Sequence, residues 1–218
     1  MRWKNKGYIL ILLGLLALFF SMYWTLFEAG LSLKNLKIQY SYYTNQVTVI
    51  SGIYLILLGF YCCGVNRLGI LVCHPTVKKV ITACVLIVCI GYYVGVVPFS
   101  LFSAEELYLL EPQSIYMHAI NPIIVLYLYR TTPSYYNSKR GIHITAQLCS
   151  ITYFLWFSFT ALSKARFTSF YVYPFLNPQV MGSKGNALLT SLMVLSIGII
   201  FILIFTKSAG TGGQRDSS

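Results

Sequence analysis

A histidine stands inside an apolar, membrane-length stretch of this sequence. Residues 115–129 read IYMHAINPIIVLYLY, with His118 near their start. An ionisable side chain within a bilayer is costly, so it marks a functional-site hypothesis. Pro122 has no N–H to donate to the carbonyl of His118, which predicts a break in the helix at this residue. His118 is therefore the first candidate for chemistry.

Small polar residues form two sets with the same spacing i, i+4, i+7. The sets are Thr44, Thr48 and Ser51, and Ser114, His118 and Asn121. This spacing places the members of a set on one face of a helix. Because polar side chains of membrane helices point into the bundle, we expect both stripes to face one interior, with Thr44 and His118 at similar depth.

A threonine beside a histidine can act as a nucleophile. Its hydroxyl is weak alone, but an imidazole within hydrogen-bond reach can take its proton during attack on an ester carbonyl. Asn45 or Asn121 can donate to the developing oxyanion. Two structural interpretations compete: Thr44 is also a good helix N-cap, and buried Ser, Thr, His and Asn commonly hydrogen-bond between membrane helices.

A third polar cluster precedes the last apolar stretch. Residues 171–178 read YVYPFLNP, and their two prolines preclude a continuous helix. Aromatic side chains suit the membrane interface. The segment is interpreted either as an ordinary aromatic belt or as an external cap, from which Tyr171, Tyr173 and Asn177 would reach a pocket.

Composition sets the class of protein that must position these residues. The chain has 218 residues, of which 57% are hydrophobic and 10% charged, whereas soluble domains carry roughly 25% charged residues. This composition predicts an integral membrane protein. The net charge of +11 does not indicate a nucleic-acid partner, because the sixteen Lys and Arg lie in short clusters between apolar stretches.

Six stretches are apolar and long enough to cross roughly 30 Å of hydrocarbon as helices. They cover about 7–27, 45–63, 80–102, 113–129, 142–163 and 187–206. We therefore predict an all-α bundle of six transmembrane helices over residues 1–207, and a disordered cytoplasmic tail over 208–218. The first stretch exceeds the apolar region of a signal peptide and lacks a clear cleavage site, so we expect it to be retained.

Basic residues predict the orientation in the cell membrane. With the N-terminus in the cytoplasm, eleven of the sixteen Lys and Arg, including Lys78 and Lys79 in a loop, fall on the cytoplasmic side. Both termini are then cytoplasmic. The six cysteines avoid the external loops, so free thiols are expected. Their spacing matches no zinc pattern, and no metal or other cofactor is predicted.

Three motifs carry a family resemblance: YSYYTNQ at 40–46, MHAINPIIVL at 117–126 and YVYPFLNPQVMG at 171–182. In this order, within six spans, they resemble the Pr-six-Pr family of prokaryotic membrane proteins and, more distantly, the androgen-induced membrane proteins of animals. The resemblance covers residues 40–188. Members of the animal branch are threonine hydrolases that cleave fatty-acid esters of hydroxy fatty acids. The resemblance implies a six-helix fold, with Thr44 and His118 at the positions of the family Thr and His.

The chain departs from the prokaryotic pattern at three places. The family Ser-Asn after the threonine is Val-Thr at 47–48, and its PFLD motif reads PFLN, with Asn177 in place of the acid. An Asp-Trp after the fourth-span motif is replaced by YLY at 127–129. An acid that would orient the histidine is therefore absent.

These observations favour an intramembrane hydrolase of lipid esters, with Thr44 as nucleophile and His118 as general base. The predicted substrate-binding residues are Asn45, Thr48, Ser51, Ser114, Asn121, Tyr171, Tyr173 and Asn177. The expected partners are membrane lipids and a lipid-ester or amphiphilic substrate. One alternative is a protein that binds or transports a small amphiphile in the same external-leaflet pocket, and another is a structural membrane subunit. Thr44 and His118 within hydrogen-bond reach would favour the enzyme, whereas a through-pore would favour transport.

Overall fold

The computed structural model describes residues 2–97, 111–134, 140–168, 171, 173 and 176–208. The chain divides into two units, Met1–Tyr135 and Tyr136–Ser218. Each unit is described by itself. In the described part of both units the regular elements are all helices, without a strand. The predicted all-α class is therefore confirmed.

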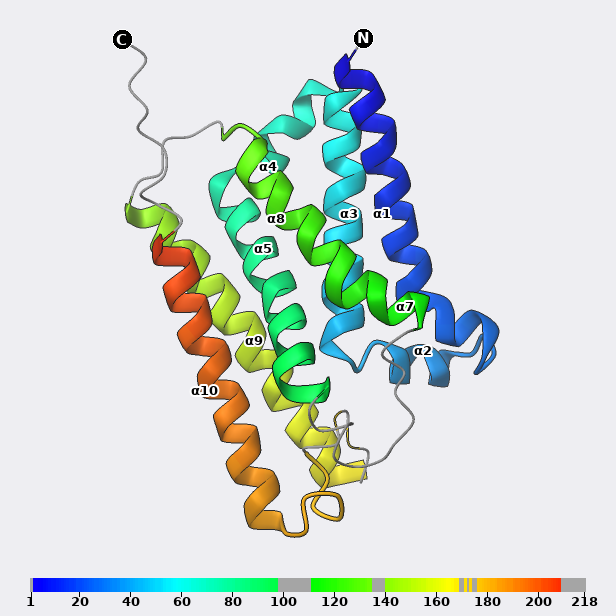
Figure 1. Ribbon diagram of the computed structural model, residues 1–218, viewed down its shortest axis with the longest axis vertical. Coiled ribbons are helices and arrows are strands. Elements are labelled where there is room, and N and C mark those ends of the chain that lie inside the picture. The colour runs from blue at the N-terminus through cyan, green and yellow to red at the C-terminus, as the bar shows by residue number, and fades with distance from the viewer. Residues whose placement is uncertain are drawn as a thin grey trace. The chain divides into compact units, whose positions relative to one another are not determined.

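The first unit contains most of the helices (Figure 1). They are α1 (Arg2–Phe27), α2 (Leu33–Gln39), α3 (Tyr43–Cys62), η1 (Asn66–Leu68), α4 (Gly69–Val72), α5 (Pro75–Ile90), η2 (Gly91–Val96), α7 (Pro112–Ile115), η4 (Tyr116–Ile120) and α8 (Asn121–Thr131). The segments η2 and η4 are π-helical and η1 is a 3-10 helix. The segment η2 continues α5 without a gap, and η4 joins α7 to α8 in the same way. We call these two continuous, irregular helices, α5–η2 and α7–η4–α8, rods.

Five helices are long and apolar enough to cross a membrane, by length and composition. They are Asn5–Phe27, Tyr43–Cys62, Pro75–Val94, Gly141–Lys164 and Lys184–Thr206. Many large apolar side chains on them are exposed, such as Ile200 and Ile204, as expected where lipid is the solvent. The chain is therefore a multi-pass membrane protein. The sixth predicted span, 113–129, corresponds to the rod α7–η4–α8, which is not among the five, so the six-span count stays a prediction.

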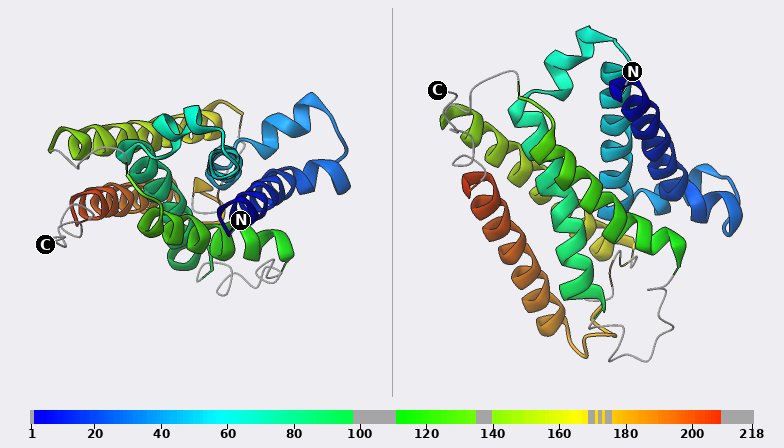
Figure 2. Two further views of the ribbon diagram at one scale, coloured as in Figure 1. Left: turned by 90° about the horizontal axis from the view of Figure 1, so that it is seen from above. Right: turned by 45° about the horizontal axis from the view of Figure 1, so that its top comes forward.

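The helices α1 and α3 lie antiparallel and side by side (Figures 1 and 2). Glycines seven residues apart on both helices allow this contact: Gly7 meets Gly59, and Gly14 meets Gly52. A Cβ built on Gly14 would lie 2.6 Å from the carbonyl oxygen of Gly52. Small residues at a membrane helix interface let two backbones approach closely. This contact fixes α3, which carries Thr44.

Two lysines contradict the predicted loop before the third span. Lys78 and Lys79 are 3% and 2% exposed, inside α5. The helix begins earlier than predicted, because Pro75 occupies its first turn and the side chain of His74 caps it. The Lys78 ammonium donates to the carbonyl of Thr132, just after α8. The placement of these charges in a loop was therefore wrong.

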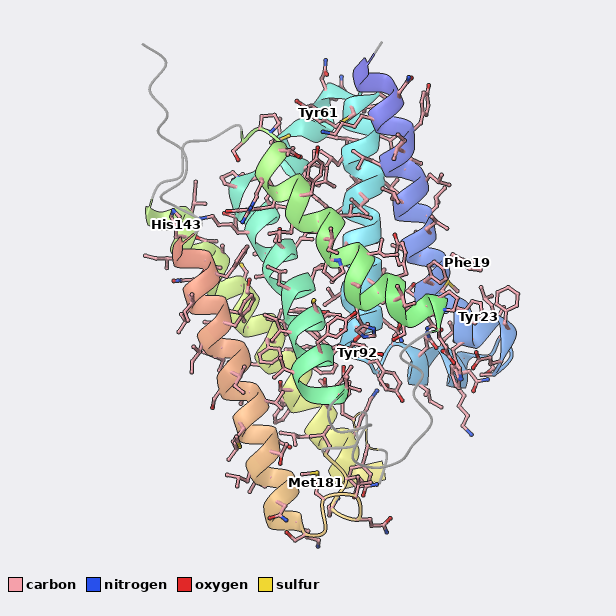
Figure 3. All side chains as sticks on the ribbon, in the orientation of Figure 1. Phe19, Tyr23, Tyr61, Tyr92, His143 and Met181 are labelled. Carbon is pink, nitrogen blue, oxygen red and sulfur yellow. The ribbon has the colours of Figure 1, made fainter. Side chains whose placement is uncertain are left out.

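The second unit is an antiparallel pair of helices, α9 (Arg140–Thr168) and α10 (Lys184–Ser208). His143, near the start of α9 (Figure 3), has its Nδ1 3.0 Å from the carbonyl oxygen of Thr206, near the end of α10. The Phe154 ring packs directly against Gly198. In the predicted cap, residues 172, 174 and 175 lie outside the described residues, as do residues 209–218 of the predicted tail.

Candidate active site

Thr44 lies in the first turn of α3. The helix starts at Tyr43, and the preceding Tyr42 has an extended backbone and makes no side-chain capping bond. Thr44 is therefore inside the helix, and the competing interpretation of Thr44 as the N-cap does not hold. The backbone N–H groups of a first turn have no acceptor within their own helix.

His118 lies in the π-helical segment η4, four residues before Pro122. The predicted break is therefore a π-helical turn. Such turns occur as single bulges within α-helices, frequently at functional sites. The histidine is buried, with 9% of its surface exposed.

The structure brings Thr44 and His118 together. The Thr44 Oγ1 lies 3.4 Å from Nε2 of His118, and Nδ1 of the same ring lies 2.9 Å from the backbone carbonyl oxygen of Ser114. A carbonyl oxygen can only accept, so this contact assigns the ring hydrogen to Nδ1. The Nε2 then carries a lone pair on the side of the Thr44 hydroxyl. The 3.4 Å contact is longer than the about 2.6–3.2 Å of a general base on its hydroxyl, as is common in ligand-free sites, where such contacts tighten when substrate binds.

Tyr92 completes the surroundings of the histidine. Its ring stacks on that of His118, with centroids 3.7 Å apart and planes 12° apart. Its hydroxyl oxygen lies 2.7 Å from Ser114 Oγ, which is 3.3 Å from Nδ1 of His118. Figure 3 shows the Tyr92 side chain between its own rod and the one that carries η4. The ring of His118 is thus held by stacking and at Nδ1.

The two polar stripes also meet further along both helices, as expected, one turn after His118 and two turns after Thr44. Asn121 Nδ2 donates to Ser51 Oγ at 2.9 Å, and Ser51 Oγ donates to the carbonyl of Thr48 at 3.0 Å. All three residues are buried. At the other end, Asn45 Nδ2 donates to the carbonyl of Gln39 at 2.8 Å. Each asparagine amide therefore has one N–H already engaged.

A cavity of about 340 Å³ lies at the N-terminal ends of α3 and α7. Its lining is Trp24, Glu28, Ile38, Gln39, Tyr42, Glu111 and Gln113. Tyr42 precedes Thr44 by two residues, and Gln113 adjoins Ser114, so the cavity lies at the same helix ends as the Thr44–His118 pair. Burial raises the pKa of the Tyr42 phenol, which keeps it protonated at neutral pH. Aromatic rings and carboxylates together suit a cationic polar head of an amphiphile.

Three predicted site residues, Tyr171, Tyr173 and Asn177, belong to the second unit. Asn177 Oδ1 accepts a hydrogen bond from the backbone N–H of Gln179 at 3.0 Å. The Tyr173 ring meets that of Phe157 edge-on, with centroids 6.3 Å apart. Their predicted contact with a substrate stays a prediction.

The cysteines are all free thiols. Burial raises the pKa of Cys73, so this thiol stays protonated and unreactive at neutral pH. Within the described ranges, no three His, Cys, Asp or Glu side chains gather as metal ligands.

Tyr92 is the site residue that sequence reasoning missed. It stands beside Tyr93 in a mainly apolar stretch, and tyrosines are common near membrane interfaces. Its contact with His118 depends on two π-helical segments, which no spacing in the sequence indicated.

Comparisons of the chain with family models, with curated proteins and with solved structures found no match. The resemblance to the Pr-six-Pr family therefore rests on the three motifs alone.

Proposed function

We propose that this protein is an intramembrane hydrolase of lipid esters, with Thr44 as nucleophile and His118 as general base. The observation that carries the proposal is the orientation of one ring. The Ser114 carbonyl holds Nδ1 at 2.9 Å, and Nε2 stands 3.4 Å from the Thr44 hydroxyl. The motifs that resemble the Pr-six-Pr family support the same two residues.

In the first step, Thr44 Oγ1 attacks the ester carbonyl carbon while His118 Nε2 takes the hydroxyl proton. The carbonyl oxygen of the ester becomes an oxyanion, to which backbone N–H groups in the first turn of α3 can donate. When the intermediate collapses, the bond to the alcohol breaks and Nε2 gives its proton to the leaving oxygen. The acyl group stays on Thr44 until water releases it as a carboxylic acid.

Ser114 and Tyr92 take the place of the acid that orients histidine in many hydrolases. The carbonyl of Ser114 fixes the ring tautomer, and the Tyr92 ring fixes its plane. Both groups are neutral, and a neutral acceptor stabilises an imidazolium less than a carboxylate does. We therefore expect a correctly oriented but moderate base.

The substrate is an amphiphile whose polar head occupies the cavity beside Trp24 and Tyr42. Its acyl chains lie along the apolar, exposed surfaces of the helices. The proposal includes the orientation indicated by the basic residues: both termini in the cytoplasm of a cell, and the cavity with Glu28 and Glu111 at the outer leaflet of its membrane.

A second candidate is a protein that binds or transports such an amphiphile without cleaving it. The observation in its favour is the cavity itself, because two aromatic rings and two carboxylates hold a polar head without any chemistry at Thr44. The two candidates differ in one property, the reactivity of the Thr44 hydroxyl.

A fluorophosphonate probe on the detergent-solubilised protein tests this reactivity. We expect one label per chain, on Thr44. General-base assistance is worth about 10²–10⁴ in rate, so Thr44→Ala and His118→Ala should each lose labelling and lipid-ester hydrolysis by at least about 10². Thr44→Ser should retain part of both.

Two matched variants control for the same side-chain changes elsewhere. Thr82 is a buried threonine that donates to the carbonyl of Lys78, and His143 lies in the second unit. Thr82→Ala and His143→Ala should label like the parent, and all variants should melt as folded proteins in detergent. An unlabelled parent, or full hydrolysis by folded Thr44→Ala, would refute the proposed hydrolase and favour the binding protein.

A further inference from the structure

Two buried polar atoms lie unpaired next to the Thr44–His118 pair. Thr48 Oγ1 and Asn121 Oδ1 have no hydrogen-bond partner among the residues that the structure describes. Each of these residues is only 1% exposed. An unpaired polar atom at such depth is costly, and in folded proteins it is commonly satisfied by an ordered water.

The two residues lie on the facing polar stripes of α3 and α8, where Ser51 contacts the side chain of Asn121 and the backbone of Thr48, and we call this place the polar spot. Asn121 Nδ2 donates to Ser51 Oγ at 2.9 Å, and that hydroxyl donates to the carbonyl of Thr48 at 3.0 Å. The one hydrogen of the Ser51 hydroxyl is thus engaged. If the Asn121 amide is turned the other way round, its nitrogen instead of its oxygen is left unpaired. The spot therefore needs a further partner in either orientation.

This spot lies one turn from the proposed reaction centre on both helices. Thr48 follows Thr44 by four residues, and Asn121 follows His118 by three. One helical turn rises about 5.4 Å, so a small molecule bound there has to move by about 2 Å to come within the about 3–3.5 Å at which it can react with the Thr44 ester. The side chains of Thr48 and Asn121 lie on the faces that bring Thr44 and His118 together.

Hydrolysis consumes water, which the hydrocarbon interior of a membrane does not supply. We infer that Thr48 and Asn121 bind one water molecule, and that this water is the second substrate of the reaction. The inference rests on the proposed function. Water fits the donors and acceptors: the Thr48 hydroxyl donates to it, and it donates to Asn121 Oδ1.

With this water, every bond made and broken in the release step can be assigned. The water oxygen attacks the acyl carbon on Thr44, and its proton passes to His118 Nε2. The tetrahedral adduct collapses, the bond between the acyl carbon and Thr44 Oγ1 breaks, and Nε2 returns the proton to Oγ1. A carboxylic acid leaves, and the enzyme regains its starting form without any oxidant or metal.

The test separates acylation from release with p-nitrophenyl laurate as substrate. Thr48→Val removes the hydroxyl and keeps the shape of the side chain, whereas Thr48→Ser keeps the hydroxyl. Thr82→Val is the matched control on α5, away from the site. The readouts are the burst of p-nitrophenol, the steady-state rate, and the mass of the Thr44 peptide.

For Thr48→Val we expect fluorophosphonate labelling and the burst within about threefold of the parent, and a steady-state rate at least about tenfold lower. Acylated Thr44 should accumulate, and added hydroxylamine, which attacks the ester in place of water, should restore turnover. Asn121→Leu, where it folds, should behave alike. Thr48→Ser, which keeps the hydroxyl, should recover most of the turnover that Thr48→Val loses, and Thr82→Val should turn over like the parent.

Unchanged turnover in folded Thr48→Val would overturn the water site and leave the hydrolase standing. Slower turnover without an acylated Thr44 would also overturn it, because the hydroxyl would then act in the first step. A parent that shows neither burst nor label would refute the proposed hydrolase itself, and the water site with it.

Discussion

Close packing of α1 on α3 can be tested by a single methyl group. In Gly14→Ala the added Cβ would lie 2.6 Å from the carbonyl oxygen of Gly52 and from Cγ1 of Ile56. Ordinary contacts of a Cβ begin at 3.4 Å. The carbonyl belongs to the backbone of α3, so side-chain rotation cannot relieve the overlap. The two helices must separate.

Overpacking of this kind costs about 1–3 kcal/mol, and alanine recovers up to about 1 kcal/mol through its better helix propensity. We therefore expect Gly14→Ala to lose about 1–2 kcal/mol of unfolding free energy. Gly91→Ala is the matched control, because Gly91 is also helical and no atom lies within 4 Å of the position that its added methyl group would take. Its unfolding free energy should stay equal or rise by up to about 1 kcal/mol.

Thermal melting in one detergent, followed by helical circular dichroism, compares the two variants. Because α3 carries Thr44, separation of the helices should also slow fluorophosphonate labelling in Gly14→Ala. The packing argument would be refuted if Gly14→Ala melted at or above the temperature of Gly91→Ala. Lower stability with unchanged labelling would show that the Thr44–His118 distance does not depend on this contact.

Two further predictions concern the site and the orientation. Tyr92→Phe keeps the stacking on His118 and loses only the hydroxyl next to Ser114, so its kcat should fall by less than about tenfold. Tyr92→Leu loses both the stacking and the hydroxyl, so its kcat should fall further. Equal rates in the two variants would contradict a role of the ring stack. The variants Lys34→Cys and Gln179→Cys should react with an impermeant maleimide on intact cells, and Asn66→Cys should react only after permeabilisation. Labelling of each variant is compared with that of the parent. The reverse pattern would show that the protein has the opposite orientation in the membrane.

The proximity of Thr44 and His118 could be predicted because it follows from local rules. A spacing of i, i+4, i+7 defines a helix face, and burial of polar groups away from lipid brings two such faces together. The contacts of Thr44 with His118 and of Asn121 with Ser51 confirm this expectation. The break ahead of Pro122 was predictable for the same reason, since a missing N–H is a property of the residue alone.

Features that depend on long-range packing could not be predicted. Lys78 was expected in a loop because a charge is costly in a membrane helix, but a carbonyl at the end of α8 accepts from its ammonium. Tyr92 is part of the site through a stacking contact between two rods distant in sequence. The sequence around Lys78 and around Tyr92 contains no periodic pattern that indicates these contacts.

The backbone around His118 accounts for both the break in its helix and the orientation of its ring. Because Pro122 has no N–H, α-helical pairing fails ahead of it, and the chain turns through the π-helix η4. In a π-helix each N–H donates to the carbonyl five residues earlier rather than four. In η4 the N–H of Asn121 donates to the carbonyl of Tyr116 in this way. The carbonyl of Ser114, at the start of the same segment, accepts from Nδ1 of the His118 ring and leaves Nε2 to Thr44. This contact explains how a histidine without an acid partner is oriented as a base.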